Sequence, residues 1–241
     1  MDPRRAVSRT LDPRPASTTD VPIAHPDLAT RDPDSGARAE PYYLALADIS
    51  GYTAFLQGVA RTHGVDFSAG IPAGYSVIGA LLDAVVGGLA SPFAIAKIEG
   101  DAVFATAPVD AFDGRGEELL ERLRAIDAAF RAVQAESTLA SDHLCTACPV
   151  AGTLWLKFIV HRGFAVTVTG GTHTEIHGPA VNVVHRLLKN HVTERIGVRP
   201  YVLLTRDAAT ALGLAARGRY HVETYPDVGT IAGRILRSVA T

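Results

Sequence analysis

The chain has 241 residues, of which 47% are hydrophobic, and its formal net charge is −2. This length and composition support one full hydrophobic core, with residues to spare for a tail. The near-neutral charge gives no basic surface for nucleic acid or for an anionic membrane, and no apolar run approaches the roughly 20 residues of a spanning helix. The sequence therefore predicts neither a nucleic-acid partner nor a membrane segment.

The cysteine content and the first residues bear on the compartment. Two cysteines do not make a disulfide framework, and they suit a reducing cytosol. The N-terminus carries arginines but lacks the apolar segment of a secretory signal. We therefore expect a cytoplasmic protein.

Residues 1–40 are predicted to form a disordered tail. Charged stretches broken by proline recur there and offer little that a core could bury, namely Asp2-Pro3-Arg4-Arg5, Asp12-Pro13-Arg14-Pro15 and Arg31-Asp32-Pro33-Asp34. Residues 41–241 are predicted to form the folded domain.

The domain begins with an apolar run of strand length from Tyr42, which ends at one carboxylate, Asp48. A charge at the end of a buried strand is costly unless it is paired or bound to a metal. Ser50-Gly51 then breaks the strand, and residues 52–63 have a helical pattern. A strand, an acid, a glycine turn and a helix commonly place a ligand at the carboxyl end of a strand.

A second carboxylate follows in a predicted hairpin. Residues 75–89 read as a helix, and residues 93–106 read as two short strands joined by a tight Glu-Gly-Asp turn that carries Asp101. If the Asp48 strand and this hairpin are neighbours, the two carboxylates are able to hold one pair of divalent cations. Carboxylate oxygens combined with substrate phosphates are the ligands that magnesium prefers.

The rest of the chain alternates helices and strands. Residues 116–136 form the clearest amphipathic helix, followed by a polar loop over 137–150. A hairpin turning at Arg162-Gly163, a loop over 170–178 and a helix over 179–192 come next. The remaining predicted elements are a strand over 201–204, a helix over 207–212 capped by Thr205, and strands over 219–224 and 228–237. This order predicts an α+β, ferredoxin-like fold.

The helix after Gly178 carries two polar side chains on one face. Asn182 and Arg186 are four residues apart, so they project together. An amide and a guanidinium side by side suit a sugar and an anion, and arginine suits a phosphate whose charge grows in a transition state.

Three stretches together resemble the class III adenylyl and guanylyl cyclases. They are Ala47-Asp48-Ile49-Ser50-Gly51-Tyr52-Thr53, Lys97-Ile98-Glu99-Gly100-Asp101, and the helix from Gly178 to Arg186, with His161-Arg162-Gly163 before it. The resemblance spans about residues 42–204 in the order of the family, and segments around Lys157 and His185 also resemble an uncharacterised, cyclase-like bacterial branch. It implies the nucleotide cyclase fold, a mainly antiparallel sheet with helices mostly on one face.

The resemblance also implies a reaction and a set of roles. Asp48 and Asp101, with the backbone at Ile49, would bind two magnesium or manganese ions, and the chain would convert ATP to cyclic AMP and pyrophosphate. Asn182 would position the ribose and Arg186 would stabilise the α-phosphate charge. In this family one subunit supplies the aspartates and the other supplies the asparagine and arginine, so a homodimer with two equivalent sites is implied.

Base recognition by resemblance falls to Lys97 and Glu175. Lys97 stands where the family has an adenine-reading lysine, and Glu175 stands where its usual partner is an aspartate. ATP is favoured as substrate, while GTP and pyrimidine triphosphates remain open, because a base pocket rejects wrong hydrogen-bond patterns strongly. A second departure is that no lysine follows Lys189, although typical members carry a late lysine for the triphosphate. Substitutes for it would be Arg217, Arg219 or Arg234.

Other readings of these residues stay open. If each residue is considered alone, Asp48 is compatible with a role as a helix cap and Asp101 with a role as an ordinary turn residue. Arg186 alone is compatible with a surface ion pair to a carboxylate. Cys145 and Cys148 have the spacing of half a zinc site. Two alternative functions follow: a degenerate cyclase-like domain that binds nucleotide or dimerises without turnover, and a zinc-stabilised interaction module.

Overall fold

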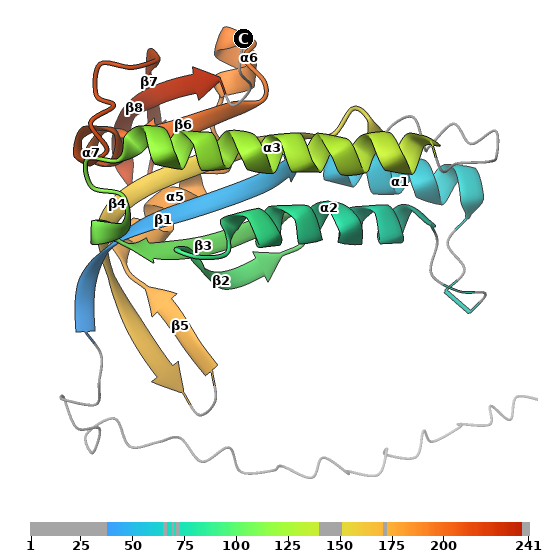
Figure 1. Ribbon diagram of the computed structural model, residues 1–241, viewed down its shortest axis with the longest axis horizontal. Helices are drawn as coiled ribbons and strands as arrows, with labels where there is room; N and C mark the ends of the chain where they lie inside the picture. The colour runs from blue at the N-terminus through green and yellow to red at the C-terminus, as the bar shows by residue number, and fades with distance from the viewer. Residues whose placement is uncertain are drawn as a thin grey trace, which may run out of the picture. The chain divides into compact units, whose positions relative to one another are not determined.

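The fold is organised around one large sheet (Figure 1). The computed structural model describes residues 38–64, 67–68, 70, 73–139, 151–170 and 173–237. Within these residues the sheet has eight strands in the order β2-β3-β1-β4-β6-β8-β7, and β5 pairs with β4 off this path. The strands are β1 (Arg38–Ser50), β2 (Ala94–Glu99), β3 (Ala102–Pro108), β4 (Trp155–Gly170), β5 (His173–His177), β6 (Tyr201–Thr205), β7 (Arg219–Tyr225) and β8 (Gly229–Arg237).

Neighbouring strands are antiparallel except for one pair. β4 and β6 run parallel, with Lys157 opposite Tyr201, because the chain between them crosses over the sheet through helices. The expected α+β fold with a mainly antiparallel sheet is confirmed. Residues 36–241 form one compact unit, to which every described residue belongs.

Helices connect the strands of the sheet. The helices are α1 (Tyr52–His63), α2 (Ala73–Leu89), a short 3₁₀ turn η2 (Val109–Ala111), α3 (Gly116–Leu139), α5 (Pro179–Leu187), α6 (Val192–Ile196) and α7 (Arg206–Ala211). The expected cap of α7 is present, because the Thr205 hydroxyl accepts from the backbone N–H of Ala208 at 3.5 Å.

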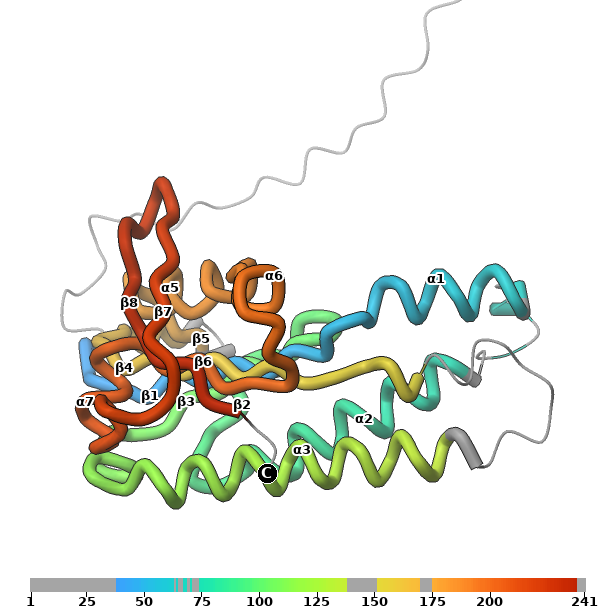
Figure 2. Tube along the Cα trace, turned by 90° about the horizontal axis from the view of Figure 1, so that it is seen from above, coloured from blue at the N-terminus to red at the C-terminus, as the bar shows by residue number. Residues whose placement is uncertain are grey.

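Two apolar clusters lie on the two faces of the sheet. The larger one joins alternate residues of β1 and β4, such as Ala47 and Phe158, to α1, α2, α3 and α7. The smaller one joins the residues between them, such as Leu46 and Ile159, to α5 and α6. Figure 2 shows α2 and α3 side by side on the first face. Helices therefore cover mostly one face, as expected, while α5 and α6 cover part of the other.

The predicted hairpin at Arg162-Gly163 is wrong. β4 runs without interruption through these residues, because β1 offers it a partner along its whole length, with Tyr43 opposite Arg162 and Tyr42 opposite Gly163. An Arg-Gly pair reads as a turn locally, but thirteen paired residues of β1 override that preference. The strand β1 itself begins at Arg38, inside the range predicted to be a tail.

Two shorter predictions also change. The predicted loop over 170–178 contains β5, which pairs with the end of β4 to make an arm that extends from the sheet (Figure 1). The predicted helix over 179–192 ends at Leu187, and a second helix, α6, begins at Val192. In the gap between them the Asn190 side chain accepts from the backbone N–H of Val192 at 3.0 Å. Asparagine competes with the helical backbone in this way, so the helix stops there.

Some predictions fall outside the described residues. The tail up to residue 37 and the loop with Cys145 and Cys148 are among them, so disorder and the zinc half-site stay predictions. Among the described helices, none combines the length and the apolar character needed to cross a bilayer.

Candidate active site

The two predicted metal aspartates come together at one end of β1. The strand β1 pairs with β3, and Asp48 lies opposite Ala102, the residue after Asp101. The backbone N–H of Ile49 donates to the Asp101 carbonyl at 3.0 Å, so the tip of the β2–β3 hairpin is bonded directly to β1. The condition set by the sequence, that the two segments be neighbours, is therefore met. Asp48 and Asp101 are called the acidic pair below.

Two glycines let the backbone make the turns on which the acidic pair depends. Gly100 has φ +62°, a conformation that favours glycine and closes the tight hairpin before Asp101. Gly51 has φ +95° and ends β1, and a Cβ at this position would meet the Leu154 side chain at 3.2 Å. The chain therefore leaves the sheet at Gly51, three residues after Asp48.

The electrostatics of the acidic pair favour a bound cation. Burial, and next to it the negative charge of Asp48, raise the pKa of the Asp101 carboxyl. Two carboxylates close together each disfavour ionisation of the other, and a positive charge between them relieves that cost. A cation bound beside Asp101 would favour the charged form of this carboxyl.

A lysine that the sequence analysis did not place lies beside the acidic pair. The Lys157 ammonium is 3.1 Å from Oδ2 of Asp48 and donates to the backbone carbonyl of Leu188 at 2.9 Å. The Ser50 hydroxyl donates to the same Asp48 oxygen at 3.2 Å. The side chains of Lys157 and Asp48 are only 16% and 13% exposed, so solvent screens this ion pair less than a surface pair.

A signal for Lys157 is present in the sequence. It stands inside the apolar run Leu156–Val160, and strand alternation directs it to the same face as Ile159. A lone lysine on a buried face needs a partner, and the carboxylate directly across β1 is that of Asp48. Without the pairing register of β1 and β4, the sequence offers no means of choosing this partner.

The oxygen donors at the acidic pair fit a hard divalent cation. The carboxylates of Asp48 and Asp101 and the backbone carbonyl of Ile49 are ligand types that suit magnesium or manganese. These ions commonly take one or two protein carboxylates together with phosphate oxygens and water. In the part of the chain that the structure describes, no group of three or more His, Cys, Asp and Glu side chains is arranged to hold a metal.

Asn182 and Arg186 lie on the exposed face of α5, here called the α5 face. The same helix packs on the sheet through Ala180, Val184 and Leu187, which are buried. Arg186 donates through Nε to Oδ2 of Asp227 at 2.5 Å, in the turn between β7 and β8. Burial raises the pKa of Asp227, but its hydrogen bonds, the one from Arg186 above all, outweigh this and lower it. Within one chain Arg186 is paired with this turn.

The two residues predicted to recognise the base, Lys97 and Glu175, each have a nearer charged partner than the other. Lys97 forms an ion pair with Glu99 at 2.6 Å, and this partner raises the Lys97 pKa and lowers that of Glu99. The charge of Glu175 also raises the Lys97 pKa, so Glu175 lies within electrostatic range. Glu175 itself is 3.6 Å from the His177 ring on β5.

The helix α5 is linked to the hairpin that carries Asp101. His185 packs edge-on against the Phe104 ring, with 5.1 Å between centroids, and lies 3.7 Å from Glu99. Burial lowers the pKa of His185, so its role at neutral pH is packing rather than charge. Of the predicted site residues, Asp48, Lys97 and Asp101 thus lie on the β1–β3 part of the sheet and its hairpin, Asn182 and Arg186 lie on α5, and Glu175 lies on β5.

Comparison with solved structures identifies the architecture. A guanylyl cyclase, Cya2, superimposes with a TM-score of 0.57 over 84% of this chain and 94% of its own, at 13% identity. The adenylyl cyclase CyaB from Pseudomonas aeruginosa gives a TM-score of 0.55 over 83% and 95%, at 12% identity. The chain has the class III nucleotide cyclase fold. Identities this low establish the fold and leave the chemistry to the residues described above.

Sequence comparisons give no activity. Residues 78–195 match the family DUF2652, described as a protein of unknown function. An uncharacterised protein of Mycobacterium tuberculosis is 30% identical over 139 residues, which are 57% of this chain and 61% of the relative. The chain thus spans about three fifths of the length of this relative. This likeness agrees with the expected resemblance to an uncharacterised bacterial branch.

Proposed function

We propose that this protein is a nucleotide cyclase that converts ATP to cyclic AMP and pyrophosphate. The observation that carries the proposal is the acidic pair, placed together by the β1–β3 ladder on a class III cyclase fold. In the reaction the ribose 3′-oxygen bonds to the α-phosphorus and its proton passes to water. At the same time the bond between the α-phosphorus and the oxygen that bridges to the β-phosphate breaks. Pyrophosphate leaves in line with the attacking oxygen.

The metal requirement follows from the acidic pair. Asp48, Asp101 and the Ile49 carbonyl would hold two magnesium or manganese ions, which lower the pKa of the ribose hydroxyl and neutralise the triphosphate when bound. Such an ion would favour the charged form of Asp101, whose pKa is raised by burial and by the charge of Asp48. Lys157 adds a fixed positive charge at Asp48, on the side of the sheet where the triphosphate would lie.

The α5 face supplies the remaining chemistry. Asn182 would hold the ribose so that its 3′-oxygen faces the phosphorus, and Arg186 would meet the charge that grows on the α-phosphate. Inside one chain Arg186 is paired with Asp227, and the resemblance to class III cyclases implies that in a dimer it would serve the acidic pair of the second copy. A two-fold homodimer then has two equivalent sites, each made from both chains.

Base selection would depend on Lys97 and Glu175. The Lys97 ammonium donates and the Glu175 carboxylate accepts, which matches the acceptor and the amino donor on the pairing edge of adenine. Glu99 also holds Lys97, at 2.6 Å, so a nucleotide must compete with this ion pair. We propose ATP as the preferred substrate on this basis.

A second candidate is a cyclase-like domain that binds nucleotide without turning it over. Lys157 neutralises Asp48 at 3.1 Å and thereby lowers its demand for a metal. A class III adenylyl cyclase-like ATP-binding protein from Pseudomonas aeruginosa shares the fold, with a TM-score of 0.54 at 13% identity, over 73% of this chain and 35% of its own. The fold is therefore compatible with this second role.

Product analysis separates the two candidates. The protein is incubated with Mn²⁺ or Mg²⁺ and an equimolar mixture of the four ribonucleoside triphosphates, and products are identified by mass spectrometry while pyrophosphate is measured. The first candidate predicts cyclic AMP as the main product, formed in equal amount to pyrophosphate. Nucleotide binding by calorimetry without pyrophosphate would favour the second candidate, and absence of both would contradict each of them.

A further inference from the structure

A small pocket of about 110 Å³ lies between α7 and the paired strands β7 and β8. Its lining includes two arginines and two hydroxyl groups, which belong to Arg206 and Thr210 on α7, Tyr220 on β7 and Arg234 on β8. This set is called the arginine pocket. No residue of the lining is acidic, so the two guanidiniums give it a net charge of +2.

The two guanidiniums of the arginine pocket lack an acidic partner. Among the described residues, none forms an ion pair or a hydrogen bond with the side chain of Arg206 or Arg234. The Arg234 guanidinium lies 5.7 Å from the centre of the Tyr220 ring, a cation–π contact that holds it at the pocket without using an acceptor atom. An anion bound there would give both guanidiniums a charged acceptor.

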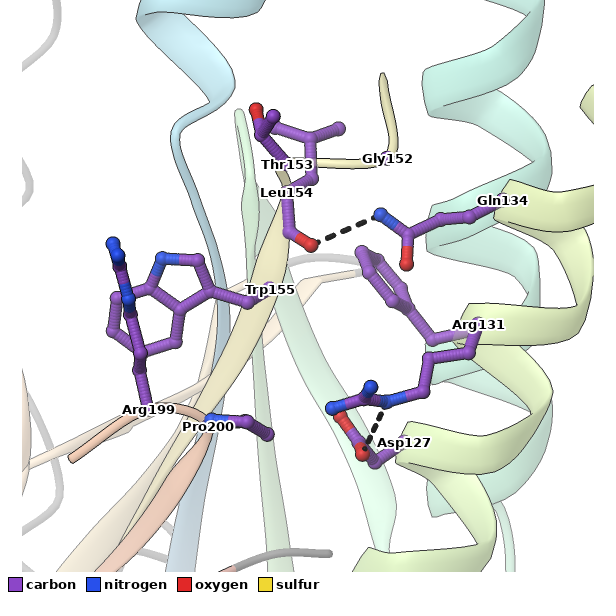
Figure 3. A pocket seen from close by; sticks show the side chains of 10 residues that line it. Asp127, Arg131, Gln134, Gly152, Thr153, Leu154, Trp155, Arg199 and Pro200 are labelled. Atoms are coloured by element: carbon purple, nitrogen blue, oxygen red, sulfur yellow. Dashed lines mark hydrogen bonds and ion pairs between the residues drawn. The ribbon is translucent and has the colours of Figure 1, made fainter. Parts of the chain in front are cut away.

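A larger pocket, of about 370 Å³, at the beginning of β4 differs in this respect (Figure 3). There Nε of Arg131 donates to Oδ2 of Asp127 at 2.9 Å, and the Gln134 amide donates to the Leu154 carbonyl at 2.9 Å. The Asp127 carboxylate and the Gln134 amide are thus already engaged by groups of the chain itself. The arginine pocket has no carboxylate that does the same for its arginines.

The arginine pocket lies on the face of the sheet opposite Asp48. Arg234 pairs across the ladder with Leu204, which belongs to the larger apolar cluster. Asp48 follows Ala47, which packs in that same cluster, so the Asp48 side chain points to the other face. Within one chain Arg234 is therefore separated by the sheet from Asp48, and the pocket is distinct from the candidate active site.

The size and the donors of the pocket define the ligand. A volume of about 110 Å³ corresponds to roughly four water molecules at about 30 Å³ each, whereas drug-sized ligands need several hundred. A phosphate group carries about −1.5 to −2 charges near pH 7, which matches the lining. Its four oxygens match two guanidiniums and the hydroxyls of Thr210 and Tyr220. We propose that the arginine pocket binds one inorganic phosphate ion, held by Arg206 and Arg234.

Phosphorus NMR of inorganic phosphate measures this binding directly. The full chain is titrated at constant ionic strength with a chelator present, so that no divalent cation occupies the acidic pair. The phosphate line should broaden, with a dissociation constant on the order of 1 mM for a ligand of five heavy atoms. Sulfate, another tetrahedral dianion, should displace phosphate at similar concentrations. Nitrate, with one charge, should need at least about tenfold more.

Matched variants assign the binding to the pocket. Arg206→Gln and Arg234→Gln should each weaken phosphate about tenfold, the usual effect of losing one charge-assisted hydrogen bond. Arg219→Gln is the control, because Arg219 adjoins Tyr220 on β7 but lies opposite Ile235 of the smaller cluster, on the other face. It removes the same charge and should leave binding within about twofold, since salt screens distant exposed charges. Far-ultraviolet circular dichroism should show the same fold in all three.

Three outcomes would overturn the proposal. One is an unchanged phosphate line up to about 20 mM phosphate, well above the expected dissociation constant. Another is equal loss of binding in the Arg219 and Arg234 variants. The third is loss of binding in Arg186→Ala with full binding in the Arg206 and Arg234 variants, which would place the ion at the α5 face. None of these results depends on cyclase turnover, so this proposal and the proposed function fail separately.

Discussion

The acidic pair and the α5 face are held in different ways. Asp48 and Asp101 are placed by a strand ladder and by a backbone hydrogen bond of 3.0 Å, and both are partly buried. Asn182 and Arg186 are exposed on a helix of nine residues, and Arg186 is paired with a surface aspartate in a hairpin turn. One group is fixed by the fold of a single chain, while the other is accessible to a second molecule.

The difference indicates where each group finds its partners. The proposed partner of the acidic pair is a cation from solvent, because burial and the charge of Asp48 disfavour the charged form of Asp101. An arginine in an exposed ion pair loses little when it exchanges that partner, because such pairs contribute about 0–1 kcal/mol. In the proposed dimer the α5 face would therefore be able to change partners, whereas the strand ladder holds the acidic pair in place.

Removal of Asp101 should have the largest effect. Asp101→Ala deletes one of the two carboxylate ligands, and several kcal/mol of charge stabilisation correspond to a loss of more than about 10³-fold in pyrophosphate release. Asp110→Ala, at an exposed position of η2, is the matched control and should keep full activity. Far-ultraviolet circular dichroism should show the same fold in both. Full turnover by the Asp101 variant would contradict the metal assignment.

Removal of Arg186 should act mainly on the chemical step. Arg186→Ala should lower kcat about 10²-fold, the usual cost of losing one group that stabilises transition-state charge, while KM changes only a few-fold. Steady-state kinetics with ATP measures both quantities. A rise in KM with kcat intact would show that the guanidinium binds the ground state instead.

Mixing the two inactive variants tests whether the two groups belong to different chains. Half of randomly re-formed dimers contain one Asp101→Ala and one Arg186→Ala chain, and each such dimer has one intact site of two. The mixture should therefore recover about a quarter of wild-type activity. No recovery above the separate variants, with dimers shown by light scattering, would place both groups in the same chain.

The raised pKa of Asp101 should appear as a small stability effect. A carboxyl group whose pKa is higher in the folded chain than its ordinary 3.8 binds its proton more tightly when folded, so stability falls as pH rises through that interval. The Asp101→Asn variant has no group that ionises at this position, so its stability does not fall in this way. Its Tm without divalent cations should match wild type near pH 3.5 and exceed it by about 1–2 °C at pH 7.

The control for this measurement is the cation. Added Mn²⁺ should raise the wild-type Tm and leave that of Asp101→Asn nearly unchanged, because ligand binding to the folded state alone adds stability. An Asp101→Asn variant with a Tm below wild type at pH 7 without cation would mean that the carboxylate is stabilising, contrary to the repulsion inferred here.

The sequence was informative where the candidate site depends on short local patterns. A glycine turn after Asp48 and a tight hairpin before Asp101 are local features, and their pairing followed once the strands were taken as neighbours. The helix face of Asn182 and Arg186 needed only the helical period. These signals do not depend on what the rest of the chain does.

The features that were missed depend on tertiary pairing. Lys157 and Asp227 meet Asp48 and Arg186 across strands and turns that are far apart in sequence. The turn predicted at Arg162-Gly163 disappears because β1 is long enough to pair with all of β4. No local pattern records the length of a partner strand, so these errors belong to single-sequence reasoning itself.

The uninterrupted course of β4 has a consequence for how the protein tolerates change. Trp155 at its beginning packs against Tyr201 of β6, with 5.7 Å between ring centroids, Lys157 touches Asp48, and its last residues pair with the strand that carries Glu175. A slip of one residue between β1 and β4 would turn Lys157 to the other face of the sheet and bring Leu156 or Phe158 opposite Asp48. Insertions or deletions in this strand should therefore be rarer than in any loop, because a shift of one residue in register would alter all three of these contacts.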